Sequence, residues 1–207
     1  MPADFDPAGL APDQQYRLVA GTVVPRPIAL VTTLGDGVVN AAPFSFFNMV
    51  GVDPPILMIS VAPRAGAATA APVMKDTVRN IEAGGEFVVN IVGRAVAEKM
   101  NACAASLPAG RSEIEAAGFF TAPSLKVAPP RLAECPASFE CKALHILKLG
   151  RKPNTMIVGE VVHFHYRDGL VDADFNVDGA ALDAVGRISG RGLYTRLTDV
   201  FAMMQPP

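Results

Sequence analysis

The sequence predicts a mainly β protein, in which an antiparallel sheet curls into a barrel with short helical insertions. Strand-forming runs follow one another directly, which favours antiparallel pairing over alternating strand and helix units. The segments with helical patterns between them are short. With 207 residues, the chain has the size of one large β-rich domain, and we expect residues 1–207 to form it.

The first strands predicted lie near the N-terminus. Strand-forming residues dominate Ile28–Leu34, Gly35–Gly37 provides a turn, and Val38–Asn40 begins the returning strand of a hairpin. A further strand, Ile56–Val61, is apolar at nearly every position, so we expect it to be buried on both faces. Prolines on both sides of Arg26 predict a rigid extended arm that fixes its guanidinium in place.

Three short helices are predicted in the middle of the chain. Asp76 and Thr77 are placed to cap a helix that ends at Gly84–Gly85. Ala95–Ala104 has a helical apolar stripe, which we assign to the core. Ser112–Glu115 has the capping-box pattern of another short helix.

The remaining strands form a long hairpin after the strand Glu86–Val92. Apolar residues alternate with polar ones from Ser138 to Leu147, which predicts a half-exposed strand with Glu140 and Lys142 on its polar face. Met156–Tyr166 is predicted to return beside it.

Histidines and cysteines give no strong sign of a metal or redox site. His163 and His165 would share one face of a strand, but no third ligand accompanies them, so we predict no metal. Cys103, Cys135 and Cys141 are odd in number and form no CxxC motif, which favours buried free thiols in a reducing compartment.

Charge and hydropathy exclude several classes of partner. The net charge is −2 and the basic residues are scattered, so we expect no nucleic-acid partner. No apolar run approaches the roughly 18 residues that cross a bilayer, and the N-terminus lacks the basic start of a secretory signal. We therefore expect no membrane partner and a cytoplasmic location.

The segment Asn40–Asn48 is the first candidate binding element. Phe44, Phe46 and Phe47 crowd around the small hydroxyl of Ser45, which is unlike the composition of a surface turn. One interpretation is a strand end that faces the core. The other is the wall of a pocket for a planar ligand.

The second candidate is the start of the helix predicted after residue 75. Lys75, Thr77 and the upstream Arg64 would bring cations, a hydroxyl and helix N–H groups together, as a phosphate site requires. A solvated helix start with ordinary surface charges is the alternative.

Familiar catalytic motifs are missing from the sequence. It contains no dinucleotide fingerprint, phosphate loop, nucleophile elbow or catalytic triad. We therefore predict no catalytic side chain and expect a bound cofactor to carry any chemistry. Close to the end, Gly190 and Gly192 between Arg187 and Tyr194 permit close approach of a neighbour or a ligand, with a surface turn as the alternative.

Several segments together resemble the flavin reductase-like, FMN-binding split-barrel family, and its flavoredoxin-like branch in particular. The resemblance covers roughly Tyr16 to Tyr194. The segments that carry it are Pro25–Thr33, Asn40–Asn48, Pro54–Pro55, Lys75–Thr77, Asn80–Ile81, Phe87–Ile91, Gly159–Val161 and Arg187–Tyr194.

This resemblance implies a Greek-key split barrel that forms a homodimer and holds FMN, rather than FAD, near the subunit interface. It also implies which residues bind the cofactor. The phosphate would meet Arg64, Lys75 and Thr77. The residues expected to line the ring and ribityl chain are Thr32, Thr33, Ala42, Pro43, Phe44, Ser45, Phe46, Phe47 and Asn48.

The activity implied by the resemblance is transfer of hydride from NAD(P)H to flavin, with electrons passed to free flavin, an oxygenase or an electron-transfer partner. Short flavin reductases similar to this family carry a histidine five residues before the glycine of the Gly-x-Val strand. Asn154 occupies that place here. The alternative function is therefore an FMN-binding electron carrier without NAD(P)H activity of its own.

Overall fold

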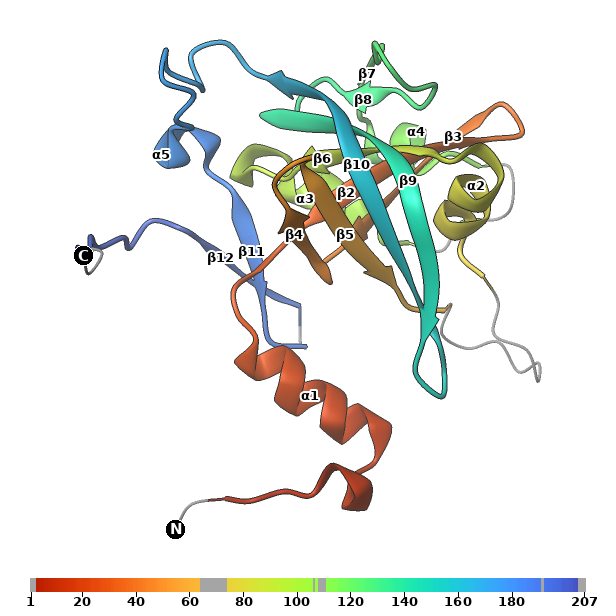
Figure 1. Cartoon of the computed structure of the whole chain (residues 1–207), viewed down its shortest axis with the longest axis vertical. Coiled ribbons are helices and arrows are strands. Elements are labelled where there is room, and N and C mark those ends of the chain that lie inside the picture. Colours follow the sequence, from red (N-terminus) through yellow and green to blue (C-terminus); the bar gives the residue numbers. More distant parts are fainter. Residues whose placement is uncertain (1–2, 64–73, 106, 108–110, 191, 205–207) are drawn as a thin grey trace.

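The structure, a computed structural model, describes residues 3–63, 74–105, 107, 111–190 and 192–204. Its main feature is a seven-stranded antiparallel sheet in the order β3-β2-β6-β9-β10-β5-β4 (Figure 1). The strands of this sheet are β2 (Ala29–Gly35), β3 (Val38–Phe44), β4 (Phe47–Gly51), β5 (Ile56–Val61), β6 (Glu86–Ile91), β9 (Ala137–Leu149) and β10 (Asn154–Tyr166).

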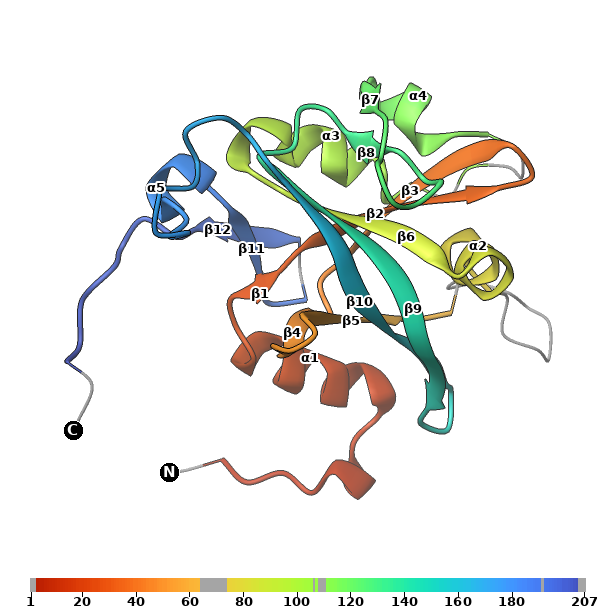
Figure 2. The same cartoon turned by 45° about the horizontal axis from the view of Figure 1, so that its top comes forward.

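Shorter elements surround the sheet (Figures 1 and 2). The helices are η1 (Pro7–Gly9), α1 (Pro12–Thr22), α2 (Asp76–Gly84), η2 (Arg94–Val96), α3 (Ala97–Ala102), α4 (Glu113–Ala117) and α5 (Gly179–Leu182). The remaining strands are β1 (Arg26–Pro27), β7 (Thr121–Ala122), β8 (Arg131–Leu132), β11 (Val185–Ile188) and β12 (Leu193–Arg196).

The strands β3 and β4 follow each other in the chain but lie at opposite edges of the sheet. The turn Ser45–Phe46 joins them, and the N–H of Ser60 on β5 donates to the carbonyl of Phe46 at 2.8 Å. The sheet therefore curls until its two edges meet at this turn. The predicted mainly β, antiparallel split barrel with short helical insertions is confirmed.

Two clusters of buried side chains lie on opposite faces of β2. Ala29 and Val31 point into the barrel, whereas Leu30 points to an outer cluster that α3 and α4 cover. The apolar stripe predicted on Ala95–Ala104 is part of this outer cluster, through Val96, Met100 and Cys103. Its assignment to the core is confirmed.

Strand β5 has the predicted bounds but buries only one of its faces. Leu57, Ile59 and Val61 are buried, and the residues between them are half-buried. The prediction of burial on both faces is wrong, because Ile56, Met58 and Ser60 on the second face keep part of their surface exposed.

A β-bulge changes the predicted alternation of β9. Ala143 and His145 pair with successive residues of β10, which leaves Leu144 as an extra residue. Because a bulge shifts the alternation by one residue, Ile146 then packs against the core and Leu147 is exposed. The alternation predicted from the sequence is therefore wrong beyond Ala143.

The predicted caps of two helices are also wrong. Lys75 is the N-cap of α2 and makes no side-chain capping bond, and Asp76 is already the first helical residue. Ser112 precedes α4, but its hydroxyl donates to the carbonyl of Val39 at 2.7 Å instead of capping the helix. The predicted ends hold, since Gly85 and Gly118 both adopt the left-handed conformation.

Arg26 anchors the N-terminal arm, as its flanking prolines predict. Its buried guanidinium donates to backbone carbonyls at the end of α1 and to that of Ser189 at 3.0 Å. Beside this contact, Gly190 approaches Tyr16 of α1, and a Cβ on the glycine would lie 2.8 Å from the ring. The close approach at Gly190 is therefore to a neighbouring side chain.

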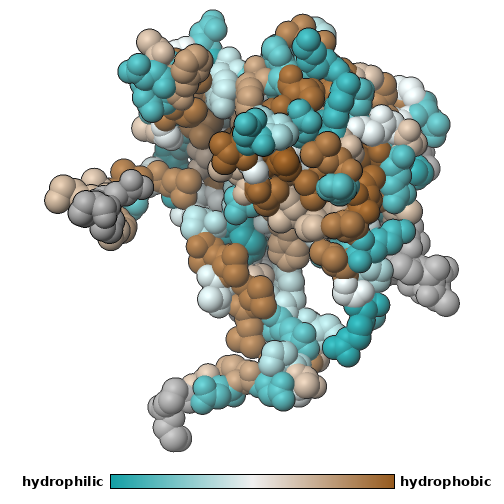
Figure 3. Space-filling view, viewed as in Figure 1, coloured by the Kyte–Doolittle hydropathy of each residue, from teal (hydrophilic) through white to brown (hydrophobic). Residues whose placement is uncertain are grey.

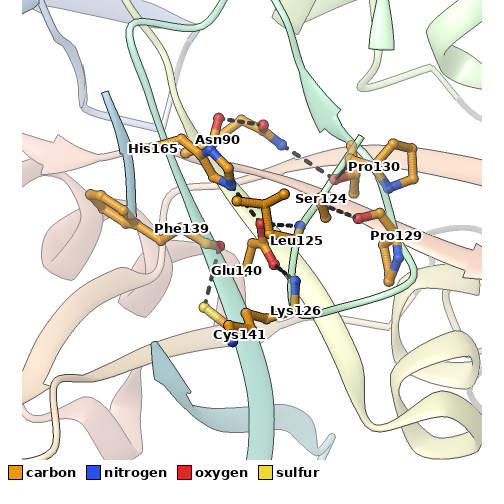
Figure 4. A network of polar contacts seen from close by, with 12 residues as sticks. Asn90, Ser124, Leu125, Lys126, Pro129, Pro130, Phe139, Glu140, Cys141 and His165 are labelled. Carbon is orange, nitrogen blue, oxygen red and sulfur yellow. Dashed lines mark hydrogen bonds and ion pairs between the residues drawn. The ribbon is translucent and has the colours of Figure 1, made fainter. Parts of the chain in front are cut away.

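Glu140 on β9 is fully buried, although its place in the alternation predicted exposure. Figure 4 shows its carboxylate facing Leu125 and Lys126, whose N–H groups donate to it, and His165 on β10. Burial alone would raise the pKa of Glu140, but the contacts with His165 and the two N–H groups outweigh it and lower the pKa. The carboxylate fastens the segment before β8 to the barrel.

We expect Glu140→Gln to lower the free energy of unfolding at pH 7 by about 1–3 kcal/mol, because the amide is a weaker acceptor for two buried N–H groups. A lowered folded-state pKa stabilises the protein above the ordinary value of 4.5, and this contribution is lost as the pH falls through the folded-state pKa. In urea unfolding, the difference in free energy of unfolding between variant and wild type should therefore be larger at pH 7 than at pH 3. The exposed Glu115→Gln is the control, and equal stabilities at pH 7 would contradict this role.

Candidate functional site

The hollow that brings predicted binding residues together lies where α2 begins, beside β3, α3 and α4. Its volume is about 90 Å³, well below the roughly 300–1,000 Å³ of pockets that enclose a small molecule. It therefore provides a seat for one end of a ligand. The residues around it are Asn40, Ala42, Pro43, Lys75, Asp76, Thr77, Cys103, Ala104, Ala105, Leu107 and Glu113.

Buried hydrogen bonds fix α2 against the β2–β3 hairpin. The hydroxyl of Thr77 donates to the side-chain oxygen of Asn40 at 3.1 Å, and the amide of Asn80 donates to the hydroxyl of Thr33 at 3.1 Å. Gly35 makes room for the second contact, since a Cβ there would lie 2.2 Å from the oxygen of Asn80. These contacts hold the N-terminus of α2 at the hollow.

A buried carboxylate closes the opposite side of the hollow. Glu113, the first residue of α4, accepts hydrogen bonds from the side-chain amide of Asn40 at 2.8 Å and from the N–H of Ala41 at 3.3 Å. Its neighbour Ser112 fastens α4 to β3 through Val39. Ser112, the N-cap, and Glu113, the first helical residue, thus both hold α4 against β3.

The positive side of the hollow is the start of α2. Lys75 is the N-cap, and its ammonium lies 5.4 Å from the centre of the Phe44 ring. Asp76 forms an ion pair with Arg79 at 2.7 Å within the same helix. The first N–H groups of a helix have no intrahelical partner and attract anions, so this end can bind a phosphate together with Lys75.

A larger hollow of about 380 Å³ lies between α3 and the β11–β12 hairpin. Its arginines are paired, Arg94 with Glu98 at 2.7 Å and Arg196 with Asp183 at 2.9 Å. Tyr194, at the end of the segment considered for a ligand, lines it, but none of the described residues predicted to bind the flavin does. The residues around it are Arg94, Ala97, Glu98, Met100, Asn101, Val185, Tyr194, Thr195 and Arg196. The hollow at α2 is therefore the candidate site.

Comparison with known proteins gives the family. Residues 20–181 match the family described as "Flavin reductase like domain". An uncharacterized protein from Deinococcus radiodurans is 40% identical over 206 residues, which cover 96% of this chain and 88% of that protein. This chain belongs to the flavin reductase-like family.

Solved structures agree with this membership of the flavin reductase-like family. Nitrilotriacetate monooxygenase component B from Bacillus cereus is similar with a TM-score of 0.91 and 32% identity, covering 98% of this chain and 99% of that one. The 2-nitrobenzoate 2-nitroreductase NbaA from Pseudomonas fluorescens is similar with a TM-score of 0.87 and 36% identity, covering 99% of this chain and 96% of that one. The resemblance to the flavin reductase-like family seen in the sequence is confirmed.

The residues predicted to bind the flavin divide into three groups. Ala42, Pro43, Lys75 and Thr77 meet at the hollow. Ser45 and Phe46 form the turn after β3 and are half-buried, and Asn48 follows in β4 and is exposed. The residues that lie in the interior are Thr32, Thr33, Phe44 and Phe47. Arg64 lies outside the described residues.

The interior residues of this set contact other parts of the protein and do not border the hollow. The hydroxyl of Thr32 donates to the carbonyl of Pro130 at 2.6 Å, and that of Thr33 accepts from Asn80. Phe44 and Phe47 belong to the main core cluster. The structure thus favours the core interpretation for these two rings, and leaves the pocket interpretation to Ala42, Pro43 and the turn.

Asn40, Asp76 and Glu113 are polar residues of the hollow that were not among the predicted binding residues. Asn40 is a buried polar residue in a strand whose neighbours are apolar, and this contrast was a usable signal. Glu113 lies within Ser112–Glu115, whose pattern is typical of a helix cap, so it was assigned a structural role. Contacts between residues so far apart in the chain leave no mark in one sequence.

The described residues contain no group of three or more side chains that would hold a metal. His163 and His165 lie beside each other, with ring centres 4.6 Å apart, and His165 contacts Glu140. The three cysteines are free and buried, as predicted. Burial raises the pKa of Cys103, which borders the hollow, to about 12, so this thiol is inert at neutral pH. No helix in the described part of the chain is long and apolar enough to cross a membrane.

Proposed function

We propose that this protein binds FMN and acts as an oxidoreductase that takes hydride from NAD(P)H and passes electrons to free flavin or to an acceptor. The observation that carries the proposal is the seat at the start of α2 in a flavin reductase-like chain. A lysine, a helix N-terminus and an apolar wall come together there. Similarity to a monooxygenase component supports an oxygenase as one partner.

The residues at the hollow fit FMN. Lys75 and the first N–H groups of α2 would hold the phosphate, because a dianion needs a local cation and donors. Ala42, Pro43 and the half-buried turn Ser45–Phe46 would form the wall along which the ring lies. A seat this small suits a terminal phosphate, so we favour FMN over FAD.

The bound flavin would supply the redox centre. The chain's residues would position it, exclude water on the wall side and offer backbone donors to the ring carbonyls and N5. We assign no catalytic side chain. Glu113 borders the hollow opposite Lys75, but its carboxylate already accepts hydrogen bonds from Asn40 and Ala41. We also propose that the protein is a homodimer. A cytoplasmic location is proposed as well, since three buried free thiols fit a reducing compartment.

An electron carrier without NAD(P)H activity is the second candidate function. Asn154 stands where related short flavin reductases carry a histidine. It lies at the start of β10, where its amide donates to the hydroxyl of Ser60 at 3.4 Å. An amide carries no titratable proton, so it cannot replace a histidine in that role.

The visible spectrum of the purified, FMN-loaded protein should distinguish these functions. We expect anaerobic addition of NADH or NADPH to remove the absorption band of oxidised flavin. No loss with either nucleotide, followed by full loss with dithionite, would favour the carrier. A protein that takes up no FMN on titration would contradict flavin binding itself.

We expect Lys75→Ala to raise the dissociation constant of FMN about tenfold or more, because a hydrogen bond to a charged phosphate contributes about 1.5–3 kcal/mol. Riboflavin, which lacks the phosphate, should bind within about twofold of wild type. Fluorescence titration with each flavin measures both constants. The exposed Lys152→Ala, in the turn between β9 and β10, is the control. Equal weakening of both flavins would refute the phosphate assignment.

Exposed apolar side chains support the proposed homodimer. Within α1, whose residues the structure describes in full, only Ala20 is buried; Val19 of this helix and Val23, which follows its last residue, are more than half exposed. Apolar residues also gather over β9 and β10 in Figure 3. The exposed apolar side chains of these two strands include Leu144 and Phe164. Exposed apolar side chains gathered in this way are typical of a protein interface.

We expect light scattering after gel filtration to give twice the mass of one chain for the wild type. Val19→Glu places a charge on the apolar face of α1 and should shift the mass toward that of one chain. Gln14→Glu, on the same helix, keeps the side-chain oxygen that accepts from Ala11 and should leave the mass unchanged. A single-chain mass for the wild type would contradict the dimer.

A further inference from the structure

Three side chains form a polar chain across the hollow at α2. The carboxylate of Glu113 accepts from the amide of Asn40 at 2.8 Å, and the oxygen of Asn40 accepts from the hydroxyl of Thr77 at 3.1 Å. All three residues are buried, and all three border the hollow. The direction of each hydrogen bond therefore decides which atoms remain available to a ligand.

The backbone fixes that direction at Glu113. The N–H of Ala41 can only donate, and it shares the oxygen Oε2 with the amide of Asn40. Asn40 must therefore turn its NH₂ group to the carboxylate and its oxygen to Thr77. The one proton of the Thr77 hydroxyl is then used within the protein, and this hydroxyl can only accept from a ligand.

The second carboxylate oxygen of Glu113 reinforces this polarity. Oε1 makes no hydrogen bond to any of the described residues, and Glu113 forms part of the wall of the hollow. This side of the hollow thus presents acceptors. A phosphate dianion has no proton to donate to them, whereas a hydroxyl group does.

We propose that Glu113 binds a hydroxyl of the flavin's ribityl chain and, through Asn40, orients Thr77 as a second acceptor for that chain. The proposal rests on the flavin function proposed above. It separates the hollow into a polyol side at Glu113 and Thr77 and a phosphate side at Lys75 and the start of α2. It also removes Thr77 from the predicted phosphate ligands.

Three flavins test the proposal by fluorescence titration: lumiflavin, which has no polyol chain, riboflavin, which has the polyol alone, and FMN. In the wild type, riboflavin should bind at least tenfold more tightly than lumiflavin. Glu113→Gln should weaken riboflavin about tenfold and leave lumiflavin within twofold. FMN should lose less than riboflavin, because the same change removes a negative charge near the phosphate.

A purely structural role for Glu113 would weaken all three flavins alike, and that outcome would overturn the proposal. Equal affinities of the wild type for riboflavin and lumiflavin would overturn it as well, while flavin binding itself would stand. If the wild type binds no flavin, the proposed function fails instead. Glu115→Gln, on the exposed side of α4, is the matched control.

A second pair of variants covers the case in which Glu113→Gln does not fold. Thr77→Val keeps the shape of the side chain but removes its oxygen, so the preference for riboflavin over lumiflavin should fall about tenfold. Thr77→Ser keeps the hydroxyl and should retain most of that preference. Equal preferences in the two variants would contradict the acceptor role of Thr77.

Discussion

The attachment of α2 to the β2–β3 hairpin is the constraint on which the candidate site depends. Thr77 and Asn80 lie one helical turn apart and reach Asn40 and Thr33, which belong to the two paired strands. Gly35 permits the close approach. Because both contacts are buried and hydrogen-bonded, the start of the helix has little freedom to move relative to β3.

This fixed geometry explains the small size of the seat. The helix N-terminus and Lys75 stand on one side and the carboxylate of Glu113 on the other, with β3 as the floor. Under the proposed function, such a space would select a ligand by its charge and by the direction of its hydrogen bonds rather than by its volume. A planar ring attached to the seated group would continue along Ala42 and Pro43 to the turn at Ser45, where the barrel edges meet.

Local patterns in the sequence predicted much of the fold. The strand β5, the long β9–β10 hairpin and the glycine ends of α2 and α4 follow from composition and periodicity, which act over a few residues. The bulge at Leu144 did not follow, because an extra residue in a pairing is a property of two strands. The burial of Glu140 did not follow either, because the segment around Leu125 that covers it lies elsewhere in the chain.

Residue patterns alone pointed to two parts of the candidate site, the segment Asn40–Asn48 and the helix start at Lys75 and Thr77, and the family resemblance added the individual residues. Ala42, Pro43, Lys75 and Thr77 do meet at one hollow. The resemblance gave no means to separate residues that face a ligand from residues such as Phe44 that pack behind it.

Determination of the structure with FMN bound tests the central claim most directly. We predict the phosphate within hydrogen-bonding distance of Lys75 and the first N–H groups of α2, with the ring along Ala42, Pro43 and the turn at Ser45. A flavin seated elsewhere, for example in the larger hollow beside Tyr194, with no ligand at the start of α2, would contradict it.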